Sequence, residues 1–229
     1  MTMSRLLFCI MLMLCASASG AMASDNALVA VRPEMRAQDA SFENPPMRWD
    51  HRPRAPDWTR GALRALKAHG RPLINIVPRD IAQWCPGYPS ADAQGRAAFW
   101  AGLLSALSKH ESTYKERAVG GGGRWYGLLQ IQPATARGYG CVAGSGDALK
   151  QGPANLSCAV RIMAATVPRD GVIADRDSRW RGVAADWGPM RVEAKRSDMQ
   201  SWLRGQSYCA LTRSLRPVAR APSQEGEGR

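Results

Sequence analysis

The sequence predicts a mainly α or α+β fold, organised as one domain between two tails. Three observations support this prediction. Helical apolar spacing recurs between residues 57 and 211, patterns typical of strands are scarce there, and no apolar period continues into either flank. The chain has 229 residues, of which 45% are hydrophobic and 22% are charged. These values fit one globular domain with tails better than two full domains.

The two tails differ in character. A basic residue, Arg5, precedes an apolar run of nine residues and a small-residue segment that ends at Ala23. Residues 1–23 therefore resemble a secretory signal peptide, and the run is too short to span a bilayer. Residues 24–56, rich in Pro and Arg, are interpreted as a linker or loosely held arm. Residues 212–229 are expected to be a disordered tail.

The domain between them, residues 57–211, is expected to contain five or six helices. Four prolines interrupt residues 71–90, which excludes a long helix there. Helix starts, stops and apolar spacing place the remaining helices. We expect helices from Asp57 or Thr59 to Gly70, over 93–114, from Pro133 to Gly138 or Gly140, from Asn155 to Pro168, around Trp180, Val183, Ala184 and Trp187, and after a capping box at Ser197.

Four cysteines remain after removal of the signal peptide: Cys85, Cys141, Cys158 and Cys209. An even number in an exported protein favours two disulfides, for which three pairings are possible. We favour Cys141–Cys158, which closes a local loop, and Cys85–Cys209, which ties the start of the domain to its end. No C-x-x-C pair occurs and the three His are scattered, so we expect no zinc site.

The net charge of +12 indicates a surface that attracts polyanions. Cell wall, lipid headgroups and nucleic acid all carry negative charge. The signal peptide argues against nucleic acid as the natural partner. Charge alone does not choose between the other two.

The helix over 93–114 carries a carboxylate in line with its apolar residues. Trp100, Leu104 and Leu107 form one stripe, and a further step of four residues reaches Glu111. At about 100° per residue, Glu111 lies only about 20° from Trp100 around the helix axis. A carboxyl group on a buried face has a raised pKa, as a general acid at neutral pH requires. The alternative is a glutamate that turns to solvent or joins a salt bridge.

Three motifs surround this carboxylate in a fixed order. KHESTY at 109–114 contains the Glu111-Ser112 pair, YGLLQIQPATA follows at 126–136, and GPANLSCAVRIMA lies at 152–164. Together they resemble lytic transglycosylases of the lysozyme-like superfamily with an SLT-type catalytic domain. The resemblance extends from about Trp84 to Gly205. It implies a lysozyme-like domain that cleaves peptidoglycan.

The resemblance implies roles for particular residues. Glu111 would protonate the glycosidic oxygen between N-acetylmuramic acid and N-acetylglucosamine, and then accept a proton from the C6 hydroxyl that closes onto C1 to give a 1,6-anhydro sugar. Ser112 would hydrogen-bond Glu111 or the N-acetyl group. No metal or organic cofactor is implied. The expected substrate-binding residues are Ser112, Tyr126, Leu129, Gln130, Asn155 and Trp187, with Asn155 alternatively serving as a helix N-cap.

One segment departs from the family pattern. The family has Ala-Tyr-Asn-Ala-Gly-Pro where this chain has AADWGP at 184–189, so Ala185 occupies the tyrosine position. Trp187 can fill the space but offers no hydroxyl. Tyr126 or Tyr139 could supply one, or the site works without it.

Several alternatives stay open on sequence grounds. A water-using muramidase on the same fold would need a second carboxylate, for which Asp186 and Glu116 are candidates. A non-catalytic wall-binding or secretion-assembly protein would keep the groove without activity. A lyase could also open the wall locally for a secretion apparatus. We expect a monomeric, exported and periplasmic protein whose partners are peptidoglycan glycan strands.

Overall fold

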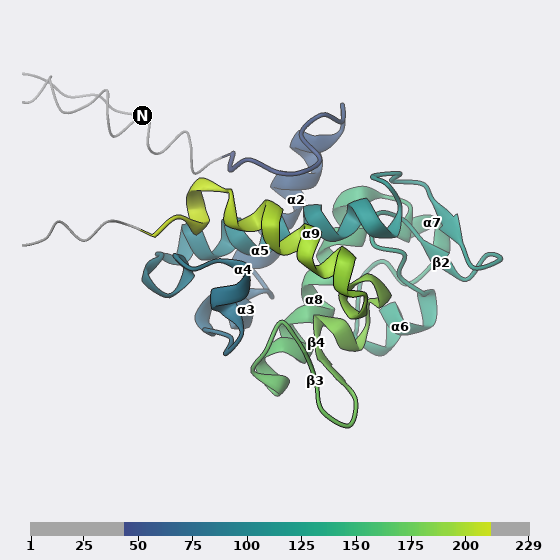
Figure 1. The fold of residues 1–229 in the computed structure, drawn as a ribbon. Coiled ribbons are helices and arrows are strands. Elements are labelled where there is room, and N and C mark those ends of the chain that lie inside the picture. The colour runs from purple at the N-terminus through teal and green to yellow at the C-terminus, as the bar shows by residue number, and fades with distance from the viewer. Residues whose placement is uncertain (1–43, 212–229) are drawn as a thin grey trace, which may run out of the picture. The chain divides into compact units, whose positions relative to one another are not determined.

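A computed structural model describes residues 44–211, which form a mainly helical body (Figure 1). The expected signal peptide, residues 24–43 of the arm and the tail from residue 212 lie outside the described residues. The body contains one buried apolar core that extends from Met47 to Cys209. Its α-helices are α2 (Ala55–Lys67), α3 (Arg71–Asn75), α4 (Ile81–Trp84), α5 (Ala93–Glu111), α6 (Pro133–Gly138), α7 (Gly146–Leu149), α8 (Gly152–Asp170) and α9 (Glu193–Arg204).

Two short antiparallel hairpins complete the body, in agreement with the mainly α or α+β fold that the sequence predicts. In the first, Val119 of β1 pairs with Tyr126 of β2. In the second, Ala174 of β3 pairs with Gly182 of β4. The strands are β1 (Val119–Gly120), β2 (Trp125–Tyr126), β3 (Ala174–Arg176) and β4 (Trp180–Gly182), and single turns of 3₁₀-helix lie at η2 (Tyr88–Ser90), η3 (Val183–Ala185), η4 (Gly188–Arg191) and η5 (Ser207–Cys209).

Helix α5 is the centre of the fold. Asp92 caps its N-terminus by accepting the N–H of Gly95 at 2.8 Å. The sequence predicts one buried stripe, but every residue from Ala97 to Ser108 is buried. Small residues explain this difference, because alanines, Gly102 and serines let neighbouring elements approach the helix on all sides. The side chain of Glu111 therefore emerges three residues after the buried part of the helix ends.

Helix α8 packs along α2 and differs from its predicted bounds at both ends. It begins at Gly152, before Asn155, and a Cβ atom on Gly61 of α2 would collide with Pro153 in its first turn. Asn155 is thus inside the helix, and the N-cap prediction is wrong. The helix also continues past Pro168 to Asp170, although Pro168 has no N–H to donate to the carbonyl of Ala164.

The predicted helix around Trp180 is also wrong. Trp180 lies in β4, Gly182 has a left-handed φ of 61°, and the chain continues through η3 and η4. Val183, Ala184 and Trp187 are buried, so their spacing reflects burial along a turning chain rather than a helix. The last helix, α9, likewise starts at Glu193, which places Ser197 inside it instead of at its cap.

The folded body begins before residue 57. Met47 and Trp49 are buried, and the Trp49 indole donates to the Thr59 hydroxyl at 2.9 Å. The expected arm therefore ends by about residue 44. Apolar residues this sparse give no periodic signal in a sequence.

Both predicted disulfides are confirmed: Cys85–Cys209 and Cys141–Cys158. The first joins the segment after α4 to η5, and the second joins the loop after α6 to α8. Within residues 44–211, no helix has the length and apolar character needed to cross a membrane.

Candidate active site

A groove of about 370 Å³ opens at the C-terminal end of α5. Its walls come from three parts of the chain: the end of α5, the hairpin β1–β2 with the loop after it, and the segment that joins η3 to η4. The lining residues are Glu111, Gly120, Gly121, Trp125, Gln130, Asp186, Trp187, Gly188 and Pro189.

Glu111 is the last residue of α5 and is half-buried in this groove. Burial raises the pKa of its carboxyl from 4.5 to about 7, while the positive charge of Lys195 on α9 acts in the opposite direction. The loss of hydration outweighs the attraction to the cation. Near neutral pH both forms of the carboxyl are populated, so the group can give and take a proton.

The backbone turns sharply directly after Glu111. Thr113 and Tyr114 have left-handed φ angles of 52° and 59°, uncommon for residues other than glycine. The Tyr114 N–H donates to the carbonyl of Ser108 at 3.3 Å, which closes the helix end. The Ser112 hydroxyl donates to the same carbonyl at 3.4 Å, so it bonds the end of the helix and not the Glu111 carboxyl.

A cluster of charged groups holds the C-terminal end of α5 against α9. Asp198 of α9 accepts two hydrogen bonds from Arg48, at 2.7 and 2.8 Å. It also contacts Lys109 at 3.2 Å and the Nε2 atom of His110 at 2.7 Å, the two residues that precede Glu111. The N-terminal segment, α5 and α9 therefore meet at one carboxylate, which restricts motion of the α5 terminus.

The glycine run at 120–123 has a steric role in the wall made by the β1–β2 hairpin. A Cβ atom on Gly121 would collide with the Trp125 ring, and one on Gly120 would collide with Oε1 of Gln130. Gln130 itself has a left-handed φ of 47°, and its Nε2 donates to the Gly127 carbonyl at 2.9 Å. Its Oε1 faces Gly120 at the groove. Trp125 stays 40% exposed, which leaves an aromatic face available to a sugar.

Asn155 holds the loop that carries Gln130. Its side chain is fully buried, its Oδ1 accepts the N–H of Leu129 at 2.9 Å, and its Nδ2 donates to the carbonyls of Tyr126 and Leu149. All of these bonds are internal. The structure thus places Asn155 behind the groove, where it positions the wall without reaching the groove surface.

Leu129 and Trp187 link the two remaining walls. The Trp187 indole donates to the Leu129 carbonyl at 3.0 Å, and the Leu129 side chain is fully buried. Since the Leu129 N–H is bonded to Asn155, both backbone groups of this residue face inward. Leu129 belongs to the core behind the groove, whereas the ring of Trp187 forms part of its lining.

The two tyrosines considered as replacements for the family tyrosine have different surroundings. The Tyr126 hydroxyl donates to the Gly123 carbonyl at 2.6 Å within the β1–β2 hairpin. Burial raises the pKa of Tyr139, and the negative charge of nearby Asp186 raises it further. Neither tyrosine lines the groove.

Of the two candidates for a second carboxylate, the fold places only Asp186 in the groove. Glu116 accepts the N–H of Gly152 at 2.7 Å at the start of α8, so it serves as a helix cap. Asp186 lines the groove together with Glu111, and burial raises its pKa against the attraction of Arg169 and Arg191. Asp186 is therefore the second carboxylate of this site. In the described part of the chain, no three His, Cys, Asp or Glu side chains gather as metal ligands would.

Comparisons with known proteins agree with this geometry. The model of the transglycosylase SLT domain family matches residues 89–185. The solved structure of wild-type Bd0314 DslA is 30% identical, has a TM-score of 0.66, and is matched over 73% of this chain and 99% of its own. This chain belongs to the transglycosylase SLT domain family.

Two glutamate-to-glutamine variants of DslA have also been solved. They match at 30% identity with TM-scores of 0.67 and 0.64. The first match covers 73% of this SLT-domain protein and 99% of the variant, and the second covers 71% and 96%. Among curated proteins, no sequence matches the chain.

The match to the family model ends at Ala185, so the groove wall at 186–189 lies outside it. Sequence reasoning missed Trp125, Gly188 and Pro189 as lining residues. An aromatic residue two positions after the glycine run at 120–123 was the available signal for Trp125. The charge of Lys195 near Glu111 had no local signal, because α9 meets the end of α5 only in the folded chain.

Proposed function

We propose that this SLT-domain protein is a peptidoglycan lytic transglycosylase in which Glu111 acts first as a general acid and then as a base. The observation that carries the proposal is the position of Glu111 in the groove with a pKa of about 7. A general acid is most effective when its pKa lies near the working pH. The family membership supports peptidoglycan as the substrate.

The proposed reaction uses groups of the substrate as its nucleophiles. Protonated Glu111 gives its proton to the glycosidic oxygen between N-acetylmuramic acid and N-acetylglucosamine, and the bond from C1 to that oxygen breaks. The N-acetyl group stabilises the developing positive charge. Ionised Glu111 then accepts the proton of the C6 hydroxyl, whose oxygen bonds to C1. The product is a 1,6-anhydro sugar, and Glu111 regains its starting state.

The walls of the groove would hold the glycan during these steps. Trp125 offers an exposed aromatic face to the apolar C–H side of a sugar ring. Gln130 offers an amide oxygen, and carbohydrate hydroxyls can donate to it. Ser112 and Tyr126 do not line the groove themselves, but they directly follow the lining residues Glu111 and Trp125 in sequence and stay proposed substrate-binding residues. Trp187 contributes its ring, because its N–H is already bonded to Leu129.

One observation favours a second candidate function. Asp186 lies in the same groove, and a water-using muramidase needs a second carboxylate to activate water or to stabilise the cation. In the lyase, Asp186 has no proton to move. The two reactions therefore differ in their dependence on this residue.

Release of soluble fragments from purified peptidoglycan tests the proposal. Glu111→Gln should reduce the rate at least about 100-fold, because the amide cannot give a proton. If the protein is a lyase, the rate of Asp186→Asn should stay within about ten-fold of the unaltered rate. If it is a hydrolase, Asp186→Asn should lose most of its activity. Glu116→Gln is the matched control, since Glu116 caps α8 away from the groove. Undiminished activity in Glu111→Gln would refute the assignment.

Export and a periplasmic location are part of the same proposal. Two disulfides agree with an oxidising compartment. Action as a monomer on glycan strands, alone or beside a secretion assembly, is the proposed setting. A folded protein that binds peptidoglycan without releasing fragments would instead support the non-catalytic alternative.

A further inference from the structure

A second cavity, of about 450 Å³, adjoins the groove and is rich in arginine. Ala185 and Arg191 line this cavity, whereas residues 186–189 between them line the groove. The segment from Ala185 to Arg191 therefore lies between the two spaces, and we call it the partition. The remaining lining residues are Arg169, Arg176, Ser178, Arg179 and Trp180.

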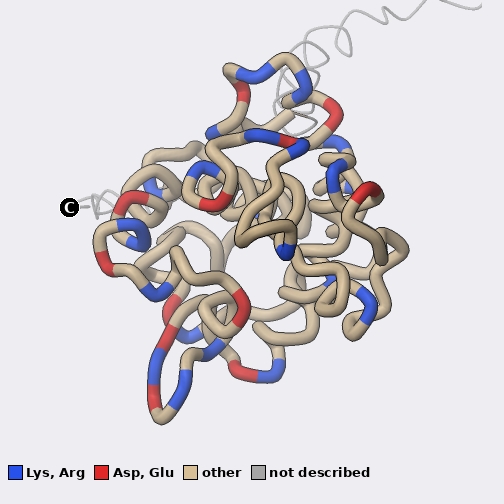
Figure 2. The backbone as a smooth tube through the Cα atoms, turned by 90° about the vertical axis from the view of Figure 1, so that its right-hand side faces the viewer, with Lys and Arg blue, Asp and Glu red and all other residues tan. Residues whose placement is uncertain are grey.

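The β3–β4 hairpin supplies much of this cavity. It projects at the bottom of the molecule in Figure 1, and in Figure 2 the same projection carries positive and negative residues in close succession. Among residues 44–211, Asp175 of the hairpin accepts only the N–H of Arg176, whereas Asp170 and Asp177 are paired with arginines. Asp177 accepts hydrogen bonds from Arg181, the shortest at 2.7 Å, and Asp170 pairs with Arg169 at 2.8 Å and accepts the N–H of Gly182.

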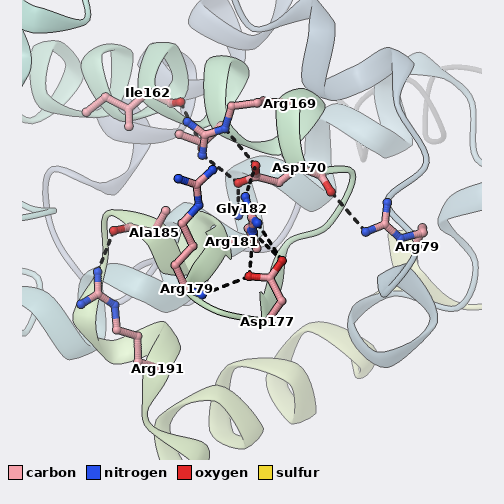
Figure 3. A network of polar contacts seen from close by, with 11 residues as sticks. Arg79, Ile162, Arg169, Asp170, Asp177, Arg179, Arg181, Gly182, Ala185 and Arg191 are labelled. Atoms are coloured by element: carbon pink, nitrogen blue, oxygen red, sulfur yellow. Dashed lines mark hydrogen bonds and ion pairs between the residues drawn. The ribbon is translucent and has the colours of Figure 1, made fainter.

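Three arginines of the cavity have no such partner. Within the described residues, no carboxylate lies within ion-pair distance of Arg176, Arg179 or Arg191. Figure 3 shows the Arg179 side chain extending toward that of Arg169. Guanidinium groups that converge in this way repel one another unless an anion lies between them.

Two of these arginines are held in place. The Arg191 guanidinium donates to the carbonyls of Ala184 and Ala185, at 2.7 and 2.6 Å, which fixes it in the partition. Arg176 stacks on the Trp180 ring, with its Cζ atom 5.4 Å from the ring centre. Cations that are fixed in advance lose less entropy when they bind an anion.

We infer that this arginine cavity binds a carboxylate of the peptide stem whose parent sugar occupies the groove. The inference rests on the proposed function and adds a determinant of substrate choice to it. Peptide stems of peptidoglycan carry free carboxylates, and guanidinium groups bind carboxylates through paired, charge-assisted hydrogen bonds. A stem that leaves the sugar would cross only the partition at 185–191 to reach the arginines, and each extended stem residue spans about 3.3–3.6 Å.

The test compares two substrates and two double variants. The substrates are intact peptidoglycan and glycan strands whose stems have been removed with an amidase. Arg176→Gln with Arg179→Gln removes two unpaired charges of the cavity. Arg64→Gln with Arg71→Gln removes two exposed charges from α2 and the start of α3 and leaves the cavity intact.

The inference predicts a change in substrate preference. The ratio of kcat/KM on intact peptidoglycan to kcat/KM on stripped strands should fall about ten-fold in the cavity variant and stay unchanged in the control. A soluble stem tetrapeptide, titrated by NMR, should bind the unaltered protein and bind the cavity variant about ten-fold more weakly. Melting curves show whether each variant is folded.

An unchanged ratio in a folded cavity variant would overturn the inference and leave the proposed function intact. So would binding of inorganic phosphate without binding of the tetrapeptide, since it would assign the cavity to a phosphate-bearing ligand. If the unaltered protein cleaves neither substrate, the proposed function fails. The tetrapeptide titration then still decides whether the cavity accepts carboxylates.

Discussion

Glu111 should reduce the stability of the folded protein at neutral pH, and replacing it with glutamine should restore that stability. Burial raises the pKa of the carboxyl from 4.5 to about 7. Because the unfolded chain ionises at the lower pKa, it is favoured increasingly as pH rises above 4.5. At about 1.4 kcal/mol for each pKa unit, the full effect above pH 7 is about 3.5 kcal/mol. Below pH 4.5 both states are protonated and the effect vanishes.

Thermal unfolding of the protein and of Glu111→Gln between pH 4 and pH 8 measures this effect. The two should melt together at pH 4, and the variant should melt about 7–14 °C higher at pH 8. Glu116→Gln is the control of the same charge change, and no gain is expected because Glu116 accepts a backbone N–H at the start of α8. Equal melting temperatures of Glu111→Gln and the unaltered protein at every pH would refute burial as the origin of the raised pKa.

Three further outcomes follow from internal contacts. Asn155→Leu should lower the free energy of unfolding in urea by at least about 3 kcal/mol, because three backbone groups lose their partner; a loss below 1 kcal/mol would contradict that role. Replacing Cys85 and Cys209 with serine should cost about 4–5 kcal/mol, since the bridge spans 124 residues. The same change at Cys141 and Cys158, a span of 17, should cost about 3 kcal/mol, and the reverse order in calorimetry would contradict the chain-entropy argument.

Features set by local sequence could be predicted well. The N-terminus of α5 follows from the cap at Asp92, and α6 runs from Pro133 to Gly138 as expected. The disulfide pairing followed from loop closure and from the position of Cys85 and Cys209 at opposite ends of the domain.

Asn155 predicts the wrong start for α8, and Pro153 is the better signal. Pro153 is common in the first turn of a helix, and it marks the observed start at Gly152. The side-chain type of Asn155 favours a cap, but its burial and its three hydrogen bonds depend on a loop that is distant in sequence. No local pattern announces such a contact.

The groove wall was the hardest part of the site to predict. Asp186 and Trp187 line it only because the β3–β4 hairpin and two 3₁₀ turns replace the expected helix. The apolar stripe predicts that Glu111 continues the one buried face of the helix, whereas α5 is buried on all sides from Ala97 to Ser108. What distinguishes Glu111 is its position at the last residue of that helix, beside the groove.

In our proposal, Glu111 drives an intramolecular ring closure and not an attack by water. Mass spectrometry of the muropeptides that the purified protein releases from peptidoglycan tests it most directly. Ring closure should give products in the 1,6-anhydro form, lighter by one water than the hydrolysis products. Reducing-end products would contradict it and assign the second catalytic carboxylate to Asp186.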